Sequence, residues 1–553
     1  MSKFTIGIDF GTLSARAVLV DVGTGTVVCC AQHKYSHGVM EECLPDGTGL
    51  SNGWALQDPH DYLDALYFTV PELLKSSGVC KDDIIGIGTD FTSCTVMPVD
   101  RQGTPLCFDS RFSGNPHAYV KHWKHHSASG LAVRMTDTAA QRGEEWLSRC
   151  GGSVSSESAL PKLWEVLIEA PEVYEAMSEW IEAADWIVWQ LTGTASRNSC
   201  CAGYKCYHSE SGGYPSGEYF SALDHRLENV VSEKLSAPVY PVGHRVGGLT
   251  EDMAVRLGLN PGTSVSAGNI DAHACVPSVG ITGPGALLAI LGTSSCFMTM
   301  SREFRPVGGV SGIVKDGILP GYYGYEAGQS SVGDILAWFT DWLLPEAYKA
   351  AAREQGSDIH SYLSSLCGKM KPGQSGLLAL DWWNGNRSIL SDAELTGLIL
   401  GMDMQTRPEE IYRALIEATA YGARVIISNY IENGVDINEI YASGGISQKN
   451  PVIVQIYADI LKMPIRISDN CQGPALGSAI WGAVAAGAGR GGYDRIEDAI
   501  SAMSSKVSRI FSPIPENSAV YDKLFNEYML LHDYYGKGGN DVMKRLISIK
   551  NSI

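Results

Sequence analysis

The sequence has no P-loop, because the pattern G-x-x-x-x-G-K-[ST] does not occur in its 553 residues. It also has no apolar run long enough to span a bilayer, since stretches such as Gly285–Leu291 and Ala479–Ala488 are short and rich in small residues. Lys3 and Asp9 interrupt the start too early for the apolar core of a signal peptide. We therefore expect no Walker-type nucleotide site, no membrane partner and no export, and a cytoplasmic location.

Basic residues are scarce relative to acidic ones. The chain has 42 Lys and Arg against 61 Asp and Glu, which gives a formal net charge of −19. Such a charge repels nucleic-acid phosphates and anionic lipid surfaces. We therefore expect no nucleic-acid partner, and an anionic ligand would need local positive charge.

Cysteine is too dilute for a disulfide scaffold. The 14 cysteines include Cys29-Cys30 and the group Cys200, Cys201 and Cys206, and neither group has the C-x-x-C or C-x-x-H spacing that zinc sites favour. Reduced thiols that act as small buried hydrophobic residues are therefore expected.

Histidines gather in one place, at positions 122, 125 and 126, but Lys121 and Lys124 lie among them. This pattern predicts a solvated helical face in preference to a metal site. The wider stretch from Arg111 to His126 is polar and aromatic, which favours an insertion that covers a substrate.

The length and composition indicate a globular protein of two or more domains. Hydrophobic residues make up 44% and charged residues 19% of the chain, so disorder is not expected, and 553 residues exceed one ordinary core. Elements of both kinds are predicted, including a strand at Ile84–Asp90, helices at Lys162–Glu169 and Glu175–Thr192, and a long helix at Thr406–Gly434 with a capping box of Thr406 and Glu409. The fold class is therefore α/β.

The first residues predict a hairpin with chemistry at its tip. A buried strand, Phe4–Asp9, leads through a small-residue turn into a second strand, Ala15–Asp21. A glycine permits close approach to an anion, hydroxyls and a guanidinium donate hydrogen bonds, and a carboxylate suits hydrated Mg²⁺. The residues suited to a triphosphate and its metal are Gly11, Thr12, Ser14, Arg16 and Asp9. Alone, the pattern also fits an ordinary hairpin turn.

The same design occurs again in the second half of the chain. The strand Ala286–Leu291 is followed by the turn Gly292-Thr293-Ser294-Ser295-Cys296 and by another strand. Two such loops could hold the phosphates of one nucleotide from both sides. Just before this hairpin, the strand around Val265 ends on a glycine and presents Asp271 at the start of a helix, so we place the domain boundary between residues 272 and 273.

A third glycine turn lies between the strand Glu439–Ser443 and a helix that Asn450 and Pro451 begin. Its pair Gly444-Gly445 suits close packing against a flat adenine ring. Elsewhere, Lys205 stands among apolar and aromatic neighbours, where a buried lysine requires a partner.

Taken in order, these motifs resemble the FGGY family of carbohydrate kinases over nearly the whole chain. The resemblance rests on Gly7-Ile8-Asp9-Phe10-Gly11-Thr12, Gly268-Asn269-Ile270-Asp271-Ala272, Gly292-Thr293-Ser294-Ser295 and Ser443-Gly444-Gly445-Ile446-Ser447. It implies two actin-like (ribonuclease H-like) domains, 1–272 and 273–553, that flank a cleft for ATP, Mg²⁺ and a sugar. The first would carry most of the sugar pocket and the second the adenosine site. Family analogy is also compatible with a homodimer.

The resemblance also implies a role for each matching residue. Asp271 corresponds to the general base and Asp9 to the residue that holds hydrated Mg²⁺. Phosphate contacts fall on Gly11, Thr12, Ser14, Arg16, Gly292 and Thr293, and adenosine contacts on Gly444, Gly445 and Asn450. Contacts to the sugar fall on Ser93, Trp123, Lys205, Asp271 and Glu326. Lys205 and Glu326 carry opposite charges, so a structural ion pair is the alternative for them.

Three functions remain open from the sequence. Stretches such as Gly88-Thr89-Asp90-Phe91-Thr92 are most similar to family members that act on L-ribulose. The favoured function is therefore ATP-dependent phosphorylation of its terminal 5-hydroxyl, in L-arabinose catabolism. The second is another sugar or polyol kinase of the family, acting on D-ribulose, xylulose, ribitol or glycerol. The third is a nucleotide-switched binding protein on an actin-like scaffold, which would lack a sugar-directed base.

Overall fold

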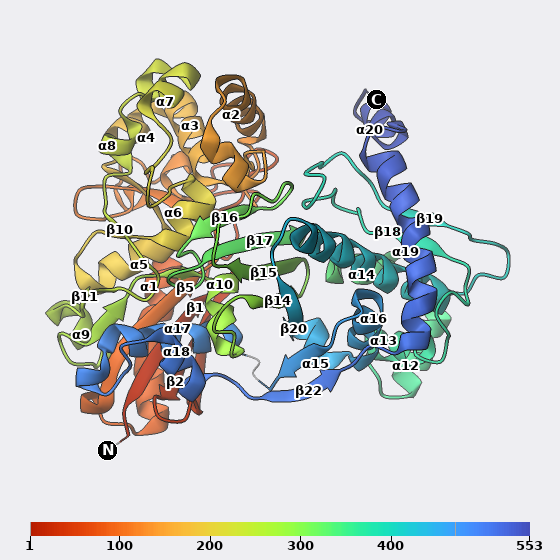
Figure 1. Ribbon diagram of the computed structural model, residues 1–553. Coiled ribbons are helices and arrows are strands. Elements are labelled where there is room, and N and C mark those ends of the chain that lie inside the picture. Colours follow the sequence, from red (N-terminus) through yellow and green to blue (C-terminus); the bar gives the residue numbers. More distant parts are fainter. Residues whose placement is uncertain (1, 470–471, 553) are drawn as a thin grey trace. The chain divides into compact units, whose positions relative to one another are not determined.

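The computed structural model describes residues 2–469 and 472–552, which form two compact units (Figure 1). The first unit contains the described residues up to Gly283 together with Gly312–Gly324 and Gln472–Ser505. The second contains Pro284–Ser311, the described residues from Tyr325 to Asp469, and those from Lys506 onward. The predicted boundary between 272 and 273 lies inside helix α10 (Asp271–Ser278), whereas the assignment changes after Gly283 and two later segments return to the first unit.

The first unit contains the strands β1 (Phe4–Phe10), β2 (Ser14–Asp21), β3 (Val27–Lys34), β4 (Leu56–Gln57), β5 (Ile84–Phe91), β6 (Val96–Val99), β7 (Val120–Lys121), β8 (Glu179–Glu182), β9 (Arg197–Asn198), β10 (Val239–Tyr240), β11 (Arg245–Gly248), β12 (Ser264–Ser266), β13 (Asn269–Ile270) and β16 (Gly312–Lys315). Its α-helices are α1 (Pro59–Ser77), α2 (Ser129–Arg142), α3 (Ala159–Glu169), α4 (Pro171–Ala176), α5 (Ala183–Thr192), α6 (Ser199–Cys206), α7 (Gly217–Leu223), α8 (Val230–Lys234), α9 (Glu251–Leu257), α10, α17 (Gly473–Ala486) and α18 (Ile496–Met503).

The second unit contains the strands β14 (Gly285–Leu291), β15 (Ser295–Ser301), β17 (Tyr323–Gln329, from Tyr325 onward), β18 (Leu378–Leu380), β19 (Leu398–Leu400), β20 (Ile437–Ser443), β21 (Ile465–Ser468) and β22 (Val507–Phe511). Its α-helices are α11 (Gly333–Trp338), α12 (Glu346–Glu354), α13 (Ile359–Cys367), α14 (Pro408–Glu432), α15 (Gly445–Lys449), α16 (Pro451–Leu461), α19 (Pro515–Gly536) and α20 (Val542–Ser552).

The main sheets of the two units have the same topology. In the first, the strand order is β3-β2-β1-β5-β12-β11, and in the second it is β17-β15-β14-β20-β21-β22. The central strands β1 and β14 each pair antiparallel with the next strand in the chain and parallel with β5 or β20. Each sheet continues with another parallel strand and then an antiparallel one. The predicted α/β class and the repeated hairpin are confirmed.

Glycines allow helix α17 to lie directly on the main sheet of the first unit, although it comes from the far end of the sequence (Figure 1). A Cβ atom at Gly7 would lie 1.8 Å from the carbonyl oxygen of Ala475, and one at Gly88 would lie 1.9 Å from that of Ser478. On the helix itself, a Cβ atom at Gly477 would lie 1.6 Å from the carbonyl oxygen of Ala274 in α10. Larger residues would push α17 away from β1, β5 and α10.

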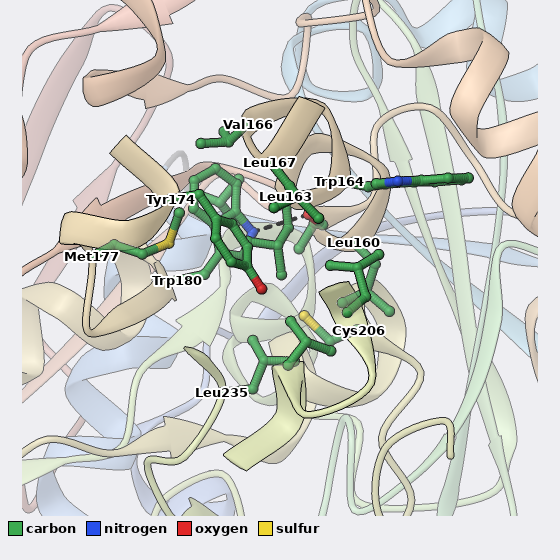
Figure 2. Close-up of a cluster of buried hydrophobic side chains, with 14 of the residues drawn as sticks. Leu160, Leu163, Trp164, Val166, Leu167, Tyr174, Met177, Trp180, Cys206 and Leu235 are labelled. Carbon is green, nitrogen blue, oxygen red and sulfur yellow. Dashed lines mark hydrogen bonds between the residues drawn. The ribbon is translucent and has the colours of Figure 1, made fainter. Parts of the chain in front are cut away.

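A separate hydrophobic core holds α3 in the first unit (Figure 2). Trp164 of α3 and Trp180 of β8 are buried in it, and the indole Nε1 of Trp180 donates to the carbonyl of Ala159 at 3.0 Å. Buried indoles of this size contribute strongly to stability and usually find a hydrogen-bond partner. This core fixes the helix that carries Lys162 and Glu165.

The predicted helix Glu175–Thr192 is wrong as a single element. Its first residues end α4, residues 179–182 form the buried strand β8, and α5 covers only the last part. Tertiary pairing of β8 with β6 competes successfully with helical propensity here. The long helix α14 is confirmed, but its capping box lies one residue later than predicted, with Arg407 N donating to Glu410 at 2.7 Å.

Every cysteine within the described residues is a free thiol, and Cys471 lies outside them. In the same part of the chain, no helix combines the length and the apolar character that crossing a membrane requires.

Candidate active site

The first loop is a tight turn whose hydroxyls remain able to donate. Gly11 N closes the turn by donating to the carbonyl of Ser14 at 3.0 Å. The Thr12 hydroxyl accepts from Trp123 Nε1 at 3.4 Å, and the Ser14 hydroxyl accepts from Gln32 at 2.9 Å. Because both hydroxyls act as acceptors in these bonds, their own protons can be donated to an anion.

Asp9 and Arg16 face each other across this hairpin, and Asp9 is also in register with Asp90 on β5. Burial raises the pKa of Asp9, while a hydrogen bond with Asp90 and the charge of Arg16 lower it. Asp90 is fully buried and accepts from the Ser478 hydroxyl of α17 at 2.5 Å. Burial and the charge of Asp9 raise its pKa well above the ordinary range.

Asp271 is the first residue of α10, as predicted, and its carboxylate accepts from Ala272 N at 2.6 Å. Its charge contributes to the raised pKa of Asp90. Asp9, Asp90 and Asp271 therefore form one group of interacting carboxyls in the first unit. A carboxylate at the start of a helix, beside a loop that is suited to binding phosphate, can accept a proton from a bound hydroxyl group.

Asp90 is a site residue to which the sequence patterns point only as the end of a strand. Its place opposite Asp9 depends on the parallel pairing of β1 with β5, which joins residues about 80 positions apart in the chain. The signal available in the sequence was an Asp at the end of a strand that is predicted to be buried.

The predicted sugar contacts of the first unit are Ser93, Trp123 and Lys205. Ser93 lies in the turn between β5 and β6, and Trp123 follows β7 and contacts Thr12. Lys205 is buried at the end of α6, and its charge acts on Glu182 of β8. Its ammonium nitrogen also lies 5.9 Å from the ring centroid of Tyr204. Burial raises the pKa of Glu182 to about 8, against the lowering effect of Lys162 and Lys205.

In the second unit, the second loop is tied to the start of α11. Gly292 N donates to the Ser294 carbonyl at 3.0 Å, two residues further on, whereas Gly11 N in the first loop donates to a carbonyl three residues further on. Val332 N donates to the Thr293 carbonyl at 2.8 Å, and Gly333 N to the Gly292 carbonyl at 3.0 Å. The loop is therefore preorganised by backbone contacts.

The glycine pair Gly444-Gly445 lies beside this loop, because Ser443 of β20 is in register with Ile290 of β14. Gly444 has a φ of +95°, and a Cβ atom there would lie 2.4 Å from the Leu291 carbonyl oxygen. A Cβ at Gly445 would meet open space, as a flat ligand requires. The Asn450 side chain caps α16 by accepting from Ile453 N at 3.2 Å and donates to Ser364 at 2.5 Å.

Glu326 is buried on β17 and accepts from Arg387 at 3.2 Å. The next residue, Ser388, accepts from Gly328 N at 3.2 Å, so the segment with Arg387 is held against β17. Arg387 has no role predicted from the sequence, because it lies 61 residues from its partner Glu326.

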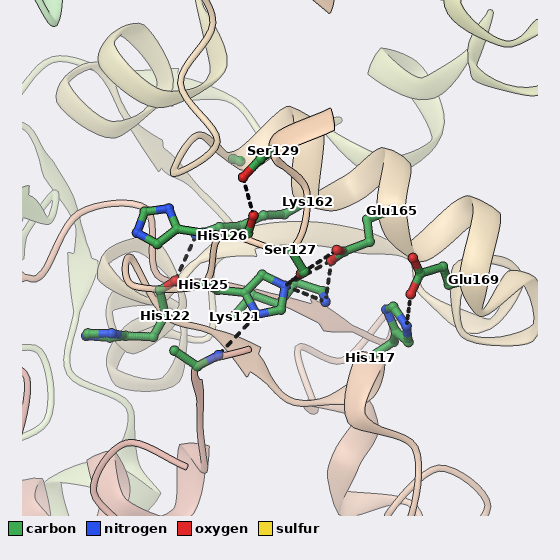
Figure 3. A network of polar contacts seen from close by, with 12 residues as sticks. His117, Lys121, His122, His125, His126, Ser127, Ser129, Lys162, Glu165 and Glu169 are labelled. Carbon is green, nitrogen blue, oxygen red and sulfur yellow. Dashed lines mark hydrogen bonds and ion pairs between the residues drawn. The ribbon is translucent and has the colours of Figure 1, made fainter. Parts of the chain in front are cut away.

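The predicted solvated face around His122 and His125 is wrong. Lys121, His122 and His125 are fully buried, and residues 120–121 form a strand instead of a helix. Lys121 Nζ lies 2.8 Å and His125 Nε2 2.9 Å from the same carboxylate oxygen of Glu165 (Figure 3). Only Lys124 and His126 among these residues are exposed. The stretch is therefore partly core, not a simple surface insertion.

The charges within this cluster compensate one another. Burial lowers the pKa of Lys121, and Glu165 opposes that effect. Burial would raise the pKa of Glu165, but the charge of Lys121 and contacts with His125 hold it well below its usual range. His125 Nδ1 accepts from Ala55 N at 3.3 Å, and its pKa is lowered to about 3 by burial. Within residues 2–469 and 472–552, no group of His, Cys, Asp and Glu has the arrangement of a metal site.

Known structures share the fold of this chain. A xylulose kinase from Rhodospirillum rubrum is 23% identical, with a TM-score of 0.78 over 96% of this chain and 98% of that one. A glycerol kinase from Plasmodium falciparum with ADP is 17% identical, with a TM-score of 0.74 over 96% and 98% of the two chains.

Sequence comparisons give closer relationships. A ribulokinase from Halalkalibacterium halodurans is 50% identical over 551 residues, covering 100% of this chain and 98% of its own. A ribulokinase from Bacillus licheniformis is 52% identical over 540 residues, covering 98% of each chain. The N-terminal domain of the FGGY family of carbohydrate kinases matches residues 4–276, and the C-terminal domain of that family matches residues 287–486. The chain therefore belongs to the FGGY family of carbohydrate kinases and is a kinase.

Proposed function

We propose that this chain transfers the γ-phosphate of ATP to the terminal 5-hydroxyl of L-ribulose, giving L-ribulose 5-phosphate in L-arabinose catabolism. The observation that carries the proposal is the position of Asp271 at the start of α10. There its charge acts on Asp90, the residue that is paired with Asp9 beside the first loop. The ribulokinase name of relatives that are about half identical over the whole chain supports L-ribulose as the acceptor. Free thiols in the described residues suit a cytoplasmic enzyme.

Phosphoryl transfer requires positioning and charge stabilisation more than covalent chemistry. Asp271 would accept the proton of the sugar hydroxyl. Thr12, Ser14 and Arg16 of the first unit and Gly292 and Thr293 of the second would contact phosphates. The adenosine would lie against Gly444 and Gly445, near Asn450. The sugar would contact Ser93, Trp123 and Lys205 of the first unit and Glu326 of the second, which assigns most of its pocket to the first.

The residues present fit a hydrated magnesium ion that arrives with ATP. Asp9 is a half-buried residue near the end of β1, and Mg²⁺ in nucleotide sites keeps several waters and uses one or two carboxylates. A bound ion would neutralise charge on the phosphates. We propose Asp9 as the residue that would hold the magnesium ion, through a bound water molecule.

An assay of ADP release with ATP-Mg²⁺ tests the acceptor. The panel contains L-ribulose, D-ribulose, D-xylulose, L-xylulose, ribitol and glycerol. We expect the highest kcat/KM for L-ribulose. A preference for another polyol would contradict the sugar assignment but retain the kinase mechanism, and a lack of acceptor-dependent ADP would contradict both.

Removal of Arg387 should weaken sugar use through Glu326. In Arg387→Ala, the buried Glu326 carboxylate loses a charge-assisted hydrogen bond of the kind that contributes about 1.5–3 kcal/mol, so we expect the KM for the ketose to rise roughly 10- to 100-fold. Glu326→Ala should have a similar effect. The KM for ATP should change less than about twofold, as measured by steady-state kinetics.

Arg305→Ala is the matched control, because Arg305 forms an exposed ion pair with Glu303 in the same unit. It should leave both KM values unchanged. Equal losses for sugar and ATP in Arg387→Ala would indicate a folding defect and contradict the assignment.

A further inference from the structure

Lys162 is a buried lysine that the catalytic roles above do not use. It lies on α3, is fully inaccessible, and donates through Nζ to the carbonyl of Cys94 at 2.8 Å and to that of His122 at 2.9 Å. Figure 3 shows it beside His122. Both hydrogen bonds go to main-chain oxygens, and the two segments that carry them are distant from α3 in the sequence.

These two carbonyls belong to neighbours of proposed sugar contacts. Cys94 follows Ser93 in the turn between β5 and β6, and it has a left-handed φ of +56°. His122 precedes Trp123 at the end of β7. Lys162 therefore joins the backbone next to Ser93 to the backbone next to Trp123.

The burial of an ammonium group is costly, and here no carboxylate oxygen of residues 2–469 and 472–552 lies within hydrogen-bond distance of the Lys162 ammonium group. Burial lowers the pKa of Lys162 to about 8, while electrostatic interactions with Cys94, Glu182 and Glu157 oppose this effect. Because burying this ammonium group costs free energy, its presence indicates that the Cys94 and His122 carbonyls must be held at a fixed separation. The core of Figure 2 fixes α3 and so gives the ammonium group a rigid base.

We propose that Lys162 is a positioning residue, which sets the separation of Ser93 and Trp123 by binding the carbonyls of Cys94 and His122. It acts on the sugar only through these two segments. The proposal rests on the proposed function, because it takes Ser93 and Trp123 as sugar contacts.

The test compares Lys162→Met with Lys234→Met in the full chain. Lys234 is a matched control in the same unit, since it is also buried and donates to a main-chain carbonyl, that of Met177 at 2.7 Å. In Lys162→Met, we expect the KM for the preferred acceptor to rise about 10-fold, with kcat and the KM for ATP within about twofold. Lys234→Met should change none of these kinetic constants.

Hydrogen exchange gives a readout that does not depend on the substrate. Backbone amides at 92–96 and 121–126 should exchange about 10-fold faster in Lys162→Met, with other segments unchanged, and should keep wild-type rates in Lys234→Met. Unchanged exchange in both segments would overturn the proposal, even if L-ribulose were the substrate. Wild-type preference for another acceptor would contradict the proposed function alone, and the exchange result would still decide the role of Lys162.

Lys162→Gln is a second variant, which keeps one donor without the charge. It should show smaller changes in KM and exchange than Lys162→Met. If neither variant yields folded protein while Lys234→Met does, Lys162 serves the stability of the whole unit and the positioning role is overturned.

Discussion

Asp271→Asn should lower kcat about 1,000-fold and leave the affinity for ATP within about twofold. Asparagine keeps the shape and the hydrogen bond to Ala272 N, but it cannot accept the proton of the sugar hydroxyl. General-base catalysis typically contributes 10²- to 10⁴-fold. Turnover is measured by acceptor-dependent ADP release, and ATP affinity by titration calorimetry with a non-hydrolysable analogue.

Asp252→Asn is the matched control for this substitution. Asp252 also lies in the first turn of a helix of the first unit, but it is exposed and pairs with Arg256. This variant should keep wild-type turnover. Full activity in Asp271→Asn would refute the assigned base, and parallel loss of ATP binding would indicate a disturbed α10.

Lys121→Met should destabilise the first unit by about 3–5 kcal/mol. The substitution leaves the Glu165 carboxylate buried with its cationic partner removed, and an uncompensated interior charge costs about this much. We expect the urea concentration at the midpoint of unfolding to fall clearly when unfolding of the full chain is monitored by tryptophan fluorescence. Lys3→Met, which removes a partly exposed ion pair with Asp83, should cost less than about 1 kcal/mol.

A double variant separates the ion pair from side-chain volume. In Lys121→Met/Glu165→Leu both charges are absent, so we expect recovery of much of the lost stability. If Lys121→Met alone matched Lys3→Met, the cluster would not contribute as described. Because the pKa of Glu165 is lower when folded, its stabilising effect is present above roughly pH 4 and declines as the pH falls through its folded value.

Local sequence patterns were sufficient for features that depend on a few neighbouring residues. The hairpins at Gly11 and Gly292 follow from strand-turn-strand patterns, and the start of α10 at Asp271 follows from a strand ending on glycine. The Asn450 cap of α16 was predictable for the same reason. Their proposed roles toward ATP and sugar came from family resemblance and stay predictions.

Features that depend on distant pairing were not predictable in this way. Lys121 looks solvated because Glu165, which compensates its charge, lies 44 residues away. Residues 179–182 look helical until β6 supplies a pairing partner. Asp90 is recognisable as a site residue only once the fold places it opposite Asp9. Arg387 is recognisable only once the fold places it beside Glu326.

The contact between α17 and the first sheet has a consequence for biosynthesis. Ser478 and Asp90 are 388 residues apart, yet α17, which carries Ser478, packs on β5, which carries Asp90. During translation, the face of β1 and β5 around Gly7 and Gly88 therefore stays uncovered until the ribosome has made most of the second unit. The first half of the chain cannot complete its core while it is being synthesised, so the nascent protein exposes apolar surface for most of its elongation.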